Sequence, residues 1–278
     1  MRGMERIAIY GKGGIGKSVT ATCLSAVFAR DGLRVLHVGC DPKRDSAVRL
    51  MAGPGPVRTV LEVLGDDPTA VSATDLVNEG RMGIHCLEAG GPRPGLGCGG
   101  RGVARTIEFL DDMEVLQTGA YDAVVFDVLG DVVCGGFAAP LRQGFAEKVL
   151  IVLSEEPMAL YAANNICRAV QVYGQNGVVL AGLVANLRSA TANRDKLRDF
   201  ATALSTSILA FVPRDEIIQD AERRRMTVVE HAPESEAARR FAELAEAVRR
   251  VDPATVPAPT PLEDDAFYAF MEAWGDGA

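Results

Sequence analysis

Short apolar runs alternate with longer amphipathic stretches along most of the chain. The apolar runs predict buried strands at residues 6–10, 34–38, 84–88, 121–127, 148–153, 178–185 and 208–212. Apolar residues at helical spacing predict helices at 19–31, 104–116, 157–173, 195–205, 216–224 and 235–251. Such alternation is typical of an α/β protein with a mostly parallel sheet flanked by helices, here in a single domain.

The first predicted strand runs into a glycine-rich loop, GKGGIGKS, at residues 11–18. The loop has the phosphate-loop pattern of glycine, four residues, glycine, lysine and serine, and it lies between a strand and a helix as the motif requires. Its glycines would let backbone N–H groups converge on a phosphate at the start of a helix. Lys17 is expected to neutralise the terminal phosphates and Ser18 to ligate Mg²⁺. The candidate nucleotide-binding residues here are Gly11, Gly13, Gly14, Ile15, Gly16, Lys17, Ser18 and Val19.

A second lysine, Lys12, lies inside the same loop. Its side chain cannot curl onto the phosphates that its own loop already surrounds. It is therefore free to reach the nucleotide of a facing subunit, and we include Lys12 among the candidate catalytic residues.

Acidic residues follow the second and fourth predicted strands. Asp41 and Asp45 come after the second strand, and Asp127 ends the fourth. Ligands of open α/β sheets bind at this edge, so Asp41 and Asp45 are candidate ligand-binding residues, although a solvated turn explains them equally well. An acid that ends an apolar strand is the pattern of the second nucleotide motif, whose aspartate holds Mg²⁺ directly or through water, so Asp127 is a candidate magnesium ligand. The loop from Asp127 to Cys134 is one that a γ-phosphate could order and its hydrolysis release.

Two of the six cysteines, Cys98 and Cys134, are flanked by glycines. Iron–sulfur clusters usually take four thiolate ligands, so one chain offers half a site and a two-fold dimer offers a whole one. The other cysteines lie in predicted helices, in a predicted strand or at the end of one, where cysteine is commonly a small buried hydrophobe. They are Cys23, Cys40, Cys86 and Cys167. No ligand spacing is found for His37, His85 and His231, which we interpret as structural.

Composition narrows the class of protein. The chain has 278 residues, of which 48% are hydrophobic, enough for one large domain. A net charge of −8 makes general nucleic-acid binding a poor interpretation. No apolar run reaches the ~18 residues of a membrane span, and a strand begins almost at once, which leaves no room for a signal peptide. We therefore expect a cytoplasmic protein without disulfides.

With the phosphate loop and the two glycine-flanked cysteines, the sequence resembles the iron protein of nitrogenase and its relatives. The likeness is carried by residues 10–18, 38–46, 90–102 and 126–140, and it extends to 161–166, 211–215 and 222–228. The resemblance covers nearly the whole chain. It implies a homodimer with MgATP in each subunit and one [4Fe–4S] cluster per dimer, held by Cys98 and Cys134 of both subunits.

The resemblance also implies roles for single residues. Catalytic positions would be Lys12, Asp41, Lys43 and Asp131. Magnesium would be held by Ser18, Asp45 and Asp127, and the adenine and ribose would lie near Asn186, Pro213, Arg214 and Asp215. Arg101 matches a surface arginine of the docking face, which is ADP-ribosylated in some relatives.

The implied function is that of an ATP-dependent reductase component that passes electrons to a nitrogenase or nitrogenase-like catalytic metalloprotein. The reaction served would be nitrogen fixation or a related reduction such as methylthio-alkane reduction, with ferredoxin or flavodoxin as the upstream donor. Residues 1–251 would form the P-loop ATPase and iron–sulfur domain, and 252–278 a proline-containing tail with a short helix. Val19, Gly99 and the pair Ala47 and Val48 depart from the usual residues of the family, without touching the ATP or cluster ligands.

Two other functions remain open. A cluster-free partitioning or positioning ATPase would share the extra-lysine loop but would need neither Cys98 nor Cys134. It would also favour a basic surface or tail, whereas the last predicted helix carries Glu263, Asp264, Asp265 and Glu272. A scaffold that carries clusters to other proteins would place its cysteines closer together.

Overall fold

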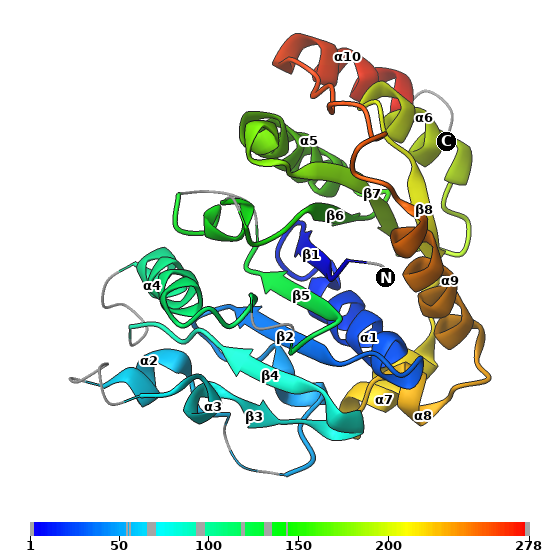
Figure 1. Cartoon of the computed structure of the whole chain (residues 1–278). Coiled ribbons are helices and arrows are strands. Elements are labelled where there is room, and N and C mark those ends of the chain that lie inside the picture. The colour runs from blue at the N-terminus through cyan, green and yellow to red at the C-terminus, as the bar shows by residue number, and fades with distance from the viewer. Residues whose placement is uncertain are drawn as a thin grey trace.

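The computed structural model describes residues 3–53, 55, 57–65, 71–92, 98–117, 120–130, 135–142 and 144–275. Within them, eight strands form one sheet in the order β3-β4-β2-β5-β1-β6-β7-β8 (Figure 1). The strands are β1 Glu5–Tyr10, β2 Val35–Cys40, β3 Asn78–Glu79, β4 His85–Glu88, β5 Ala123–Val128, β6 Lys148–Leu153, β7 Val179–Asn186 and β8 Ile208–Val212. All these pairings are parallel except that of β3 with β4, which confirms the predicted mostly parallel sheet.

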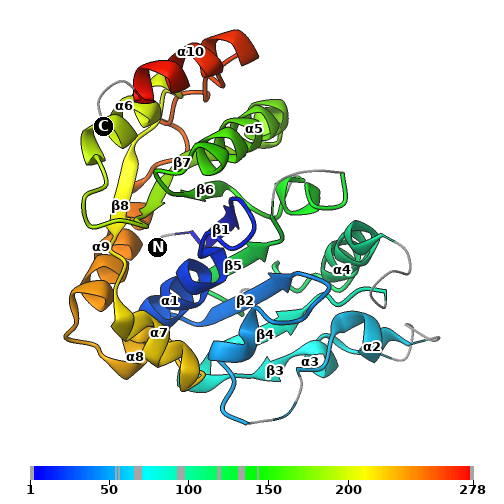
Figure 2. The ribbon, with the colours of Figure 1, turned by 180° about the vertical axis from the view of Figure 1, so that it is seen from behind.

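Helices cover both faces of the sheet (Figures 1 and 2). The longer ones are α1 Lys17–Arg30, α4 Gly99–Asp112, α5 Pro157–Tyr173, α6 Arg194–Ala203, α7 Glu216–Arg223, α9 Glu236–Arg250 and α10 Asp264–Gly275. The short ones are α2 Val60–Leu64, α3 Ala73–Leu76 and α8 Val228–His231, with single turns η1 Ala47–Arg49, η3 Arg81–Gly83, η4 Ala139–Leu141 and η5 Gly174–Asn176. Helices α1, α8 and α9 pack together on one face, and α4 and α5 lie on the other. No helix among the described residues has the length and hydrophobicity needed to cross a membrane.

The central strands are apolar on both faces because each face lies under helices. In β1, Ala8 and Tyr10 belong to the core under α4 and α5, whereas Ile7 and Ile9 belong to the core under α1 and α9. A strand that is buried on both faces has a continuous apolar run in its sequence, and this is why β1 could be predicted from the sequence. The hydroxyl of Tyr10 donates to the carbonyl of Phe137 at 3.0 Å and so connects the end of β1 to the segment after β5.

The start of α4 differs from the sequence-based prediction. The helix begins at Gly99, directly after Cys98, rather than at residue 104. Glycine has poor helix propensity, about 1 kcal/mol worse than alanine, so the sequence favoured a loop there. Tertiary packing favours the helix instead. A Cβ on Gly102 would lie 2.8 Å from the carbonyl oxygen of Gly90, so the helix can approach the Gly90 segment closely only because residue 102 is glycine. Strand β3 and helix α8 were not predicted, because each is too short to show a period.

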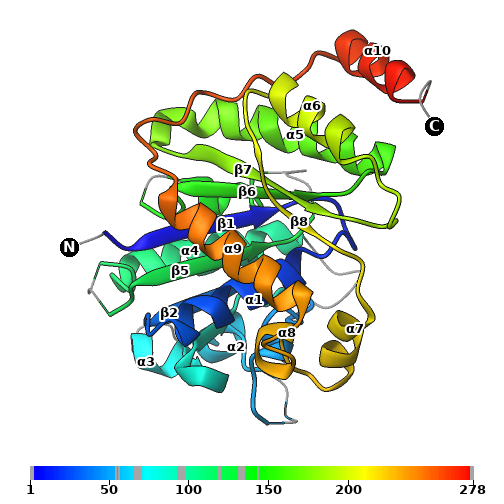
Figure 3. The same ribbon diagram turned by 90° about the vertical axis from the view of Figure 1, so that its right-hand side faces the viewer.

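The tail that follows α9 lies along α5 and ends in α10 (Figure 3). Asn164 of α5 donates to the carbonyl of Leu262 at 2.8 Å and accepts from its N–H at 2.7 Å. Phe267 of α10 is buried in the core shared with α5. The division of the chain into residues 1–251 and a tail of 252–278 stays a prediction.

Candidate functional site

The phosphate loop leaves β1 at the carboxyl edge of the sheet and ends in α1. Gly11, Gly14 and Gly16 have φ values of +146°, +73° and +104°, which side chains rarely adopt. The loop is also closely packed: a Cβ on Gly11 would lie 2.2 Å from the carbonyl oxygen of Val152, and one on Gly16 would lie 2.2 Å from Nδ2 of Asn186. The positive φ therefore favours glycine at both Gly11 and Gly16, and at Gly11 the neighbouring backbone also leaves no room for a side chain.

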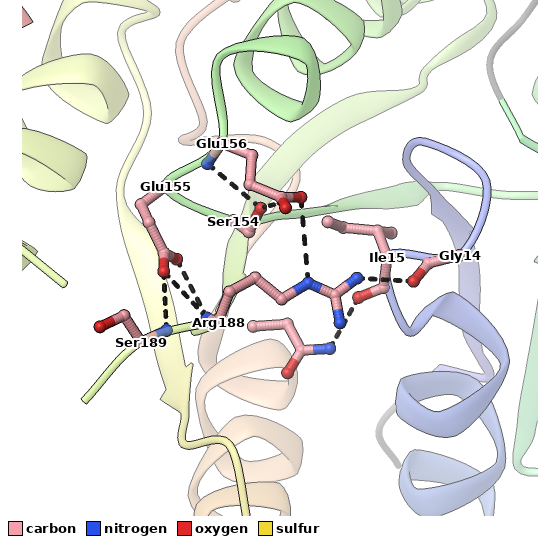
Figure 4. A network of polar contacts seen from close by, with 8 residues as sticks. Gly14, Ile15, Ser154, Glu155, Glu156, Arg188 and Ser189 are labelled. Carbon is pink, nitrogen blue, oxygen red and sulfur yellow. Dashed lines mark hydrogen bonds and ion pairs between the residues drawn. The ribbon is translucent and has the colours of Figure 1, made fainter. Parts of the chain in front are cut away.

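Two side chains, one from the last residue of β7 and one from the segment that follows it, donate hydrogen bonds to backbone carbonyls of this loop (Figure 4). Asn186 donates from Nδ2 to the carbonyl of Ile15, and Arg188 donates from its guanidinium to the carbonyl of Gly14, each at 2.6 Å. Arg188 is itself ion-paired with Glu156 at 3.9 Å. In a trans peptide the C=O and the following N–H point in opposite directions, so these bonds turn the next amides away from β7.

A pocket of about 420 Å³ opens beside the loop. Most of the predicted nucleotide and magnesium residues line it: Gly13, Gly14, Gly16, Lys17, Ser18, Val19, Asp41, Lys43, Asp45, Asp127, Asn186, Pro213, Arg214 and Asp215. Five segments that lie far apart in the sequence, around residues 13–19, 41–45, 127, 186 and 213–215, thus meet at one edge of the sheet. Gly11 and Ile15 of the same loop are buried and do not line the pocket. Lys12 does not line the pocket, although its carbonyl accepts a hydrogen bond from Nζ of Lys17 at 3.0 Å.

Sequence reasoning missed several residues of the pocket wall. Arg188 follows β7, Gln219 and Glu222 lie on α7, and Phe241 lies on α9. Arg49 joins the same wall and is ion-paired with Glu222. Each belongs to an ordinary amphipathic or polar segment, so only the tertiary fold marks it as part of the site.

Asp127 is the most enclosed acid of the pocket, with 4% of its surface exposed. Burial raises the pKa of Asp127 above its ordinary value, whereas hydrogen bonds from Ser46 and Ser18 and the charge of Lys17 oppose the shift. A divalent cation beside this carboxylate would offset the cost of burying its charge. The pocket is lined by the Ser18 hydroxyl, four aspartates (Asp41, Asp45, Asp127 and Asp215) and two lysines (Lys17 and Lys43), and these residues fit a magnesium-bound nucleoside triphosphate.

Cys98 is the exposed member of the five described cysteines. It is the N-cap residue of α4, where free backbone N–H groups favour a negatively charged group. A second pocket, of about 630 Å³, places Cys98 on one surface with Arg101, Arg105 and Glu108. An accessible thiol at a helix N-terminus fits a ligand of an anionic metal cluster. Asp131 and Cys134 lie outside the described residues.

The surroundings of Cys98 touch the loop that follows β2. A Cβ on Gly99 would lie 2.5 Å from Cγ of Pro42, and one on Gly91 would lie 2.6 Å from its Cβ. On the other side, a Cβ on Gly136 would lie 2.2 Å from the carbonyl oxygen of Gly100. These glycines allow the start of α4 to contact both the Asp41 loop and the segment after β5.

The remaining cysteines and the histidines have the structural surroundings that the sequence predicted. Cys23, Cys40, Cys86 and Cys167 are all buried. His85 bonds to Tyr121 at 2.9 Å and His231 to Asp220 at 2.9 Å. His37 is fully buried between two serines.

Comparison with known proteins decides the family. A sequence model described as 4Fe-4S iron sulfur cluster binding proteins, NifH/frxC family, matches residues 5–276. The chain belongs to this family. A nitrogenase iron protein of Methanococcus voltae is 44% identical over 272 residues, which are 97% of this chain and 96% of that relative. The resemblance to nitrogenase iron proteins is therefore confirmed, and with it an ATP-hydrolysing reductase component that uses a [4Fe–4S] cluster and MgATP.

Solved structures show the fold of this NifH/frxC protein more broadly. The septum site-determining protein MinD of Pyrococcus horikoshii, complexed with Mg-ADP, has a TM-score of 0.70 at 23% identity over 89% of this chain and 97% of its own. A ParA family ATPase of Chlorobium tepidum has a TM-score of 0.66 at 17% identity over 87% of this chain and 99% of its own. These likenesses confirm the predicted single-domain P-loop NTPase fold and, at such identities, nothing finer.

Glu88 gives this NifH/frxC protein a testable dependence of stability on pH. It is fully buried beside the site; its Oε1 accepts from the N–H of Ala47 at 2.6 Å, and its Oε2 has no partner among the described residues. Burial raises the pKa of Glu88 to about 8, against the opposing effect of the Ala47 N–H. The folded protein therefore binds this proton more tightly than the unfolded chain, whose value is 4.5. The contribution of protonated Glu88 to the free energy of unfolding is therefore fully present below pH ~4.5, and it is lost as the pH rises towards ~8.

Glu88→Gln should remove that dependence, because an amide keeps the acceptor for the Ala47 N–H and has no proton to lose. In buffer without magnesium or nucleotide, the free energy of unfolding should differ between the two proteins with a slope of up to about 1.4 kcal/mol per pH unit. Urea unfolding at several pH values between 5 and 8 measures the difference. If the free energies of unfolding of the two proteins changed with pH in parallel, the pKa of Glu88 would not be raised in the folded protein.

Proposed function

We propose that this NifH/frxC protein is a homodimer that couples MgATP hydrolysis to electron transfer from a shared [4Fe–4S] cluster into a nitrogenase or nitrogenase-like catalytic metalloprotein. One observation carries the proposal. Pro42 contacts Gly91 and Gly99, which lie on either side of Cys98, so the loop between two nucleotide-site residues, Asp41 and Lys43, touches the backbone next to the thiol. A movement of that loop on hydrolysis would be felt at the cysteine.

The roles that we propose are supported by the family and, for the residues that line the two pockets, by their positions there. The phosphate loop, residues 11–19, would bind the triphosphate, with Lys17 neutralising it, and Asn186, Pro213, Arg214 and Asp215 would bind the adenine and ribose. Ser18, Asp45 and Asp127 would hold magnesium. Lys12, Asp41, Lys43 and Asp131 would place water and charge around the γ-phosphate, where catalysis depends on positioning and neutralisation. Lys12 would act on the nucleotide of the facing subunit.

Cys98 and Cys134 of each subunit would hold the cluster, which supplies one electron at a time. Two thiolates per chain on a two-fold axis give the four ligands that such a cluster takes. Arg101 shares the surface pocket with Cys98, so we assign it to the docking face for the catalytic partner. The contacts of Gly99 and Gly136 would let the two nucleotide loops act on the cluster ligands together.

Nitrogen fixation and a related reduction such as methylthio-alkane reduction both fit this design, with ferredoxin or flavodoxin as the electron donor. Residues 1–251 would form the ATPase and iron–sulfur domain and 252–278 its tail. Free thiols suit a reducing compartment, and we place the protein in the cytoplasm, with no nucleic acid or membrane as partner. Activity assays with candidate catalytic components would identify the terminal substrate.

The cluster tests the proposal most directly. Protein purified without oxygen should contain about four irons and four sulfides per dimer, because four thiolates hold one cubane cluster. Iron and sulfide analysis with an absorbance spectrum makes the measurement. A colourless dimer without iron would contradict the proposal and would favour the second candidate, a cluster-free partitioning or positioning ATPase, whose fold this chain shares.

A further inference from the structure

A buried chain of polar side chains leads from α1 to the carboxylate of Asp127. Oγ of Ser25 lies 3.0 Å from Nδ1 of His37, and Nε2 of His37 lies 2.9 Å from Oγ of Ser46. The hydroxyl of Ser46 donates to Oδ2 of Asp127. Ser25, His37 and Ser46 are fully buried, so no bulk water competes for these contacts.

The direction of the hydrogen bonds follows from counting protons. Ser46 has one hydroxyl hydrogen and donates it to Asp127, so it can only accept from His37. Nε2 therefore carries the ring hydrogen, and the bare Nδ1 accepts from Ser25. The neutral ring that this requires agrees with the surroundings: burial lowers the pKa of His37 to about 3, and the charge of Arg49 adds to the shift.

The contacts close a ring that includes Asp127, a proposed magnesium ligand. Ser18 and Ser25 both belong to α1, and Ser18 also bonds to Asp127. The path from Ser18 to Asp127, Ser46, His37 and Ser25 returns to the helix from which it started. It thereby links the three segments that carry the proposed magnesium ligands: the start of α1, the loop after β2 and the end of β5.

We propose that His37 is a positioning residue for magnesium: its Nε2–H holds the Ser46 hydroxyl so that this hydroxyl fixes the orientation of the Asp127 carboxylate. The inference rests on the proposed function, which makes Asp127 a magnesium ligand. Groups that hydrogen-bond to a metal ligand set its orientation, and their removal typically costs 10–100-fold in metal affinity. The alternative is that His37 is a core residue that contributes only to packing. In the sheet, His37 of β2 is paired with Cys86 of β4 and Val125 of β5.

A matched pair of variants separates the two interpretations. In His37→Gln the amide nitrogen can take the place of Nε2 and still donate to Ser46, whereas in His37→Asn it reaches only the place of Nδ1. Both variants lose the ring and introduce an amide of similar polarity. Ser25 can turn its hydroxyl to a carbonyl of its own helix in either case.

The experiment is a magnesium titration of the oxygen-free holoprotein with a fluorescent ADP analogue, together with the affinity for that analogue in EDTA. The magnesium affinity should fall about tenfold in His37→Asn and change less than about threefold in His37→Gln. The affinity for the metal-free analogue should stay at the wild-type value in both. In a Ser46→Ala background the Asn substitution should have no further effect, because His37 acts through Ser46.

Equal losses in both variants, or a wild-type magnesium affinity in His37→Asn, would overturn the role of His37 alone. A wild type that binds nucleotide without any magnesium dependence would overturn the proposed function as well. Should the His37 variants fail to fold, Ser46→Ala removes the hydroxyl through which His37 acts on Asp127. It should then weaken magnesium binding about tenfold, and an unchanged affinity would refute the proposal.

Discussion

Replacing Cys98 with alanine should abolish cluster binding while leaving nucleotide binding mostly intact. The thiol is exposed at the start of α4, whereas the pocket beside the phosphate loop is lined by other segments. On a two-fold axis each substitution removes two of four ligands, so the dimer should lose the cluster rather than weaken it. Iron analysis, the visible spectrum and ATP binding to the same oxygen-free preparation measure both parts of the prediction.

Cys167→Ala is the matched control, because Cys167 is a buried cysteine of α5. It removes a sulfur of the same size but should leave the iron content unchanged, at a cost in stability of about 1 kcal/mol for the small cavity. Cys134→Ala should behave like Cys98→Ala. A full cluster in either of these two variants would refute the assignment of its ligands.

The parts of the site that the sequence predicted depend on local chain signals. Gly11 to Ser18 carry their chemistry within one strand, loop and helix, and Asp127 ends an apolar strand. Ligands bind at the carboxyl edge of a parallel sheet, and this rule alone predicts that Asp41 and Asp127 lie near one another. The pocket confirms that placement, although the roles of its residues stay predictions.

The parts that the sequence missed depend on contacts between distant segments. Arg188 reaches Gly14 from a residue that follows β7 and has no motif around it. His37 shows no ligand spacing, and its two partners, Ser25 and Ser46, come from a helix and a loop on either side of β2. The glycines at the start of α4 misled the prediction because their value is in close packing against Gly90 and Pro42, which propensity does not record.

Replacing Lys17 with alanine should remove ATP-driven electron transfer while the cluster remains. Lys17 is almost buried, and its Nζ donates to the carbonyl of Lys12 within the phosphate loop. There its charge would neutralise the terminal phosphates as the bond to the γ-phosphate breaks. Loss of a charge-assisted hydrogen bond costs about 1.5–3 kcal/mol, so ATP affinity should fall about 10–100-fold. Turnover should fall to background, because neutralisation is needed most in the transition state.

The comparison with two other lysines makes the test specific. Lys196→Ala removes a lysine that contacts Trp274 in the tail, outside the pocket, and should leave ATP binding and turnover unchanged. Lys12→Ala should preserve nucleotide binding by the subunit but lower hydrolysis, since Lys12 does not line its own pocket and is proposed to act across the dimer. Normal electron transfer in Lys17→Ala would refute its role. Weakened nucleotide binding in Lys12→Ala equal to that in Lys17→Ala would place both lysines in one site and contradict action between subunits.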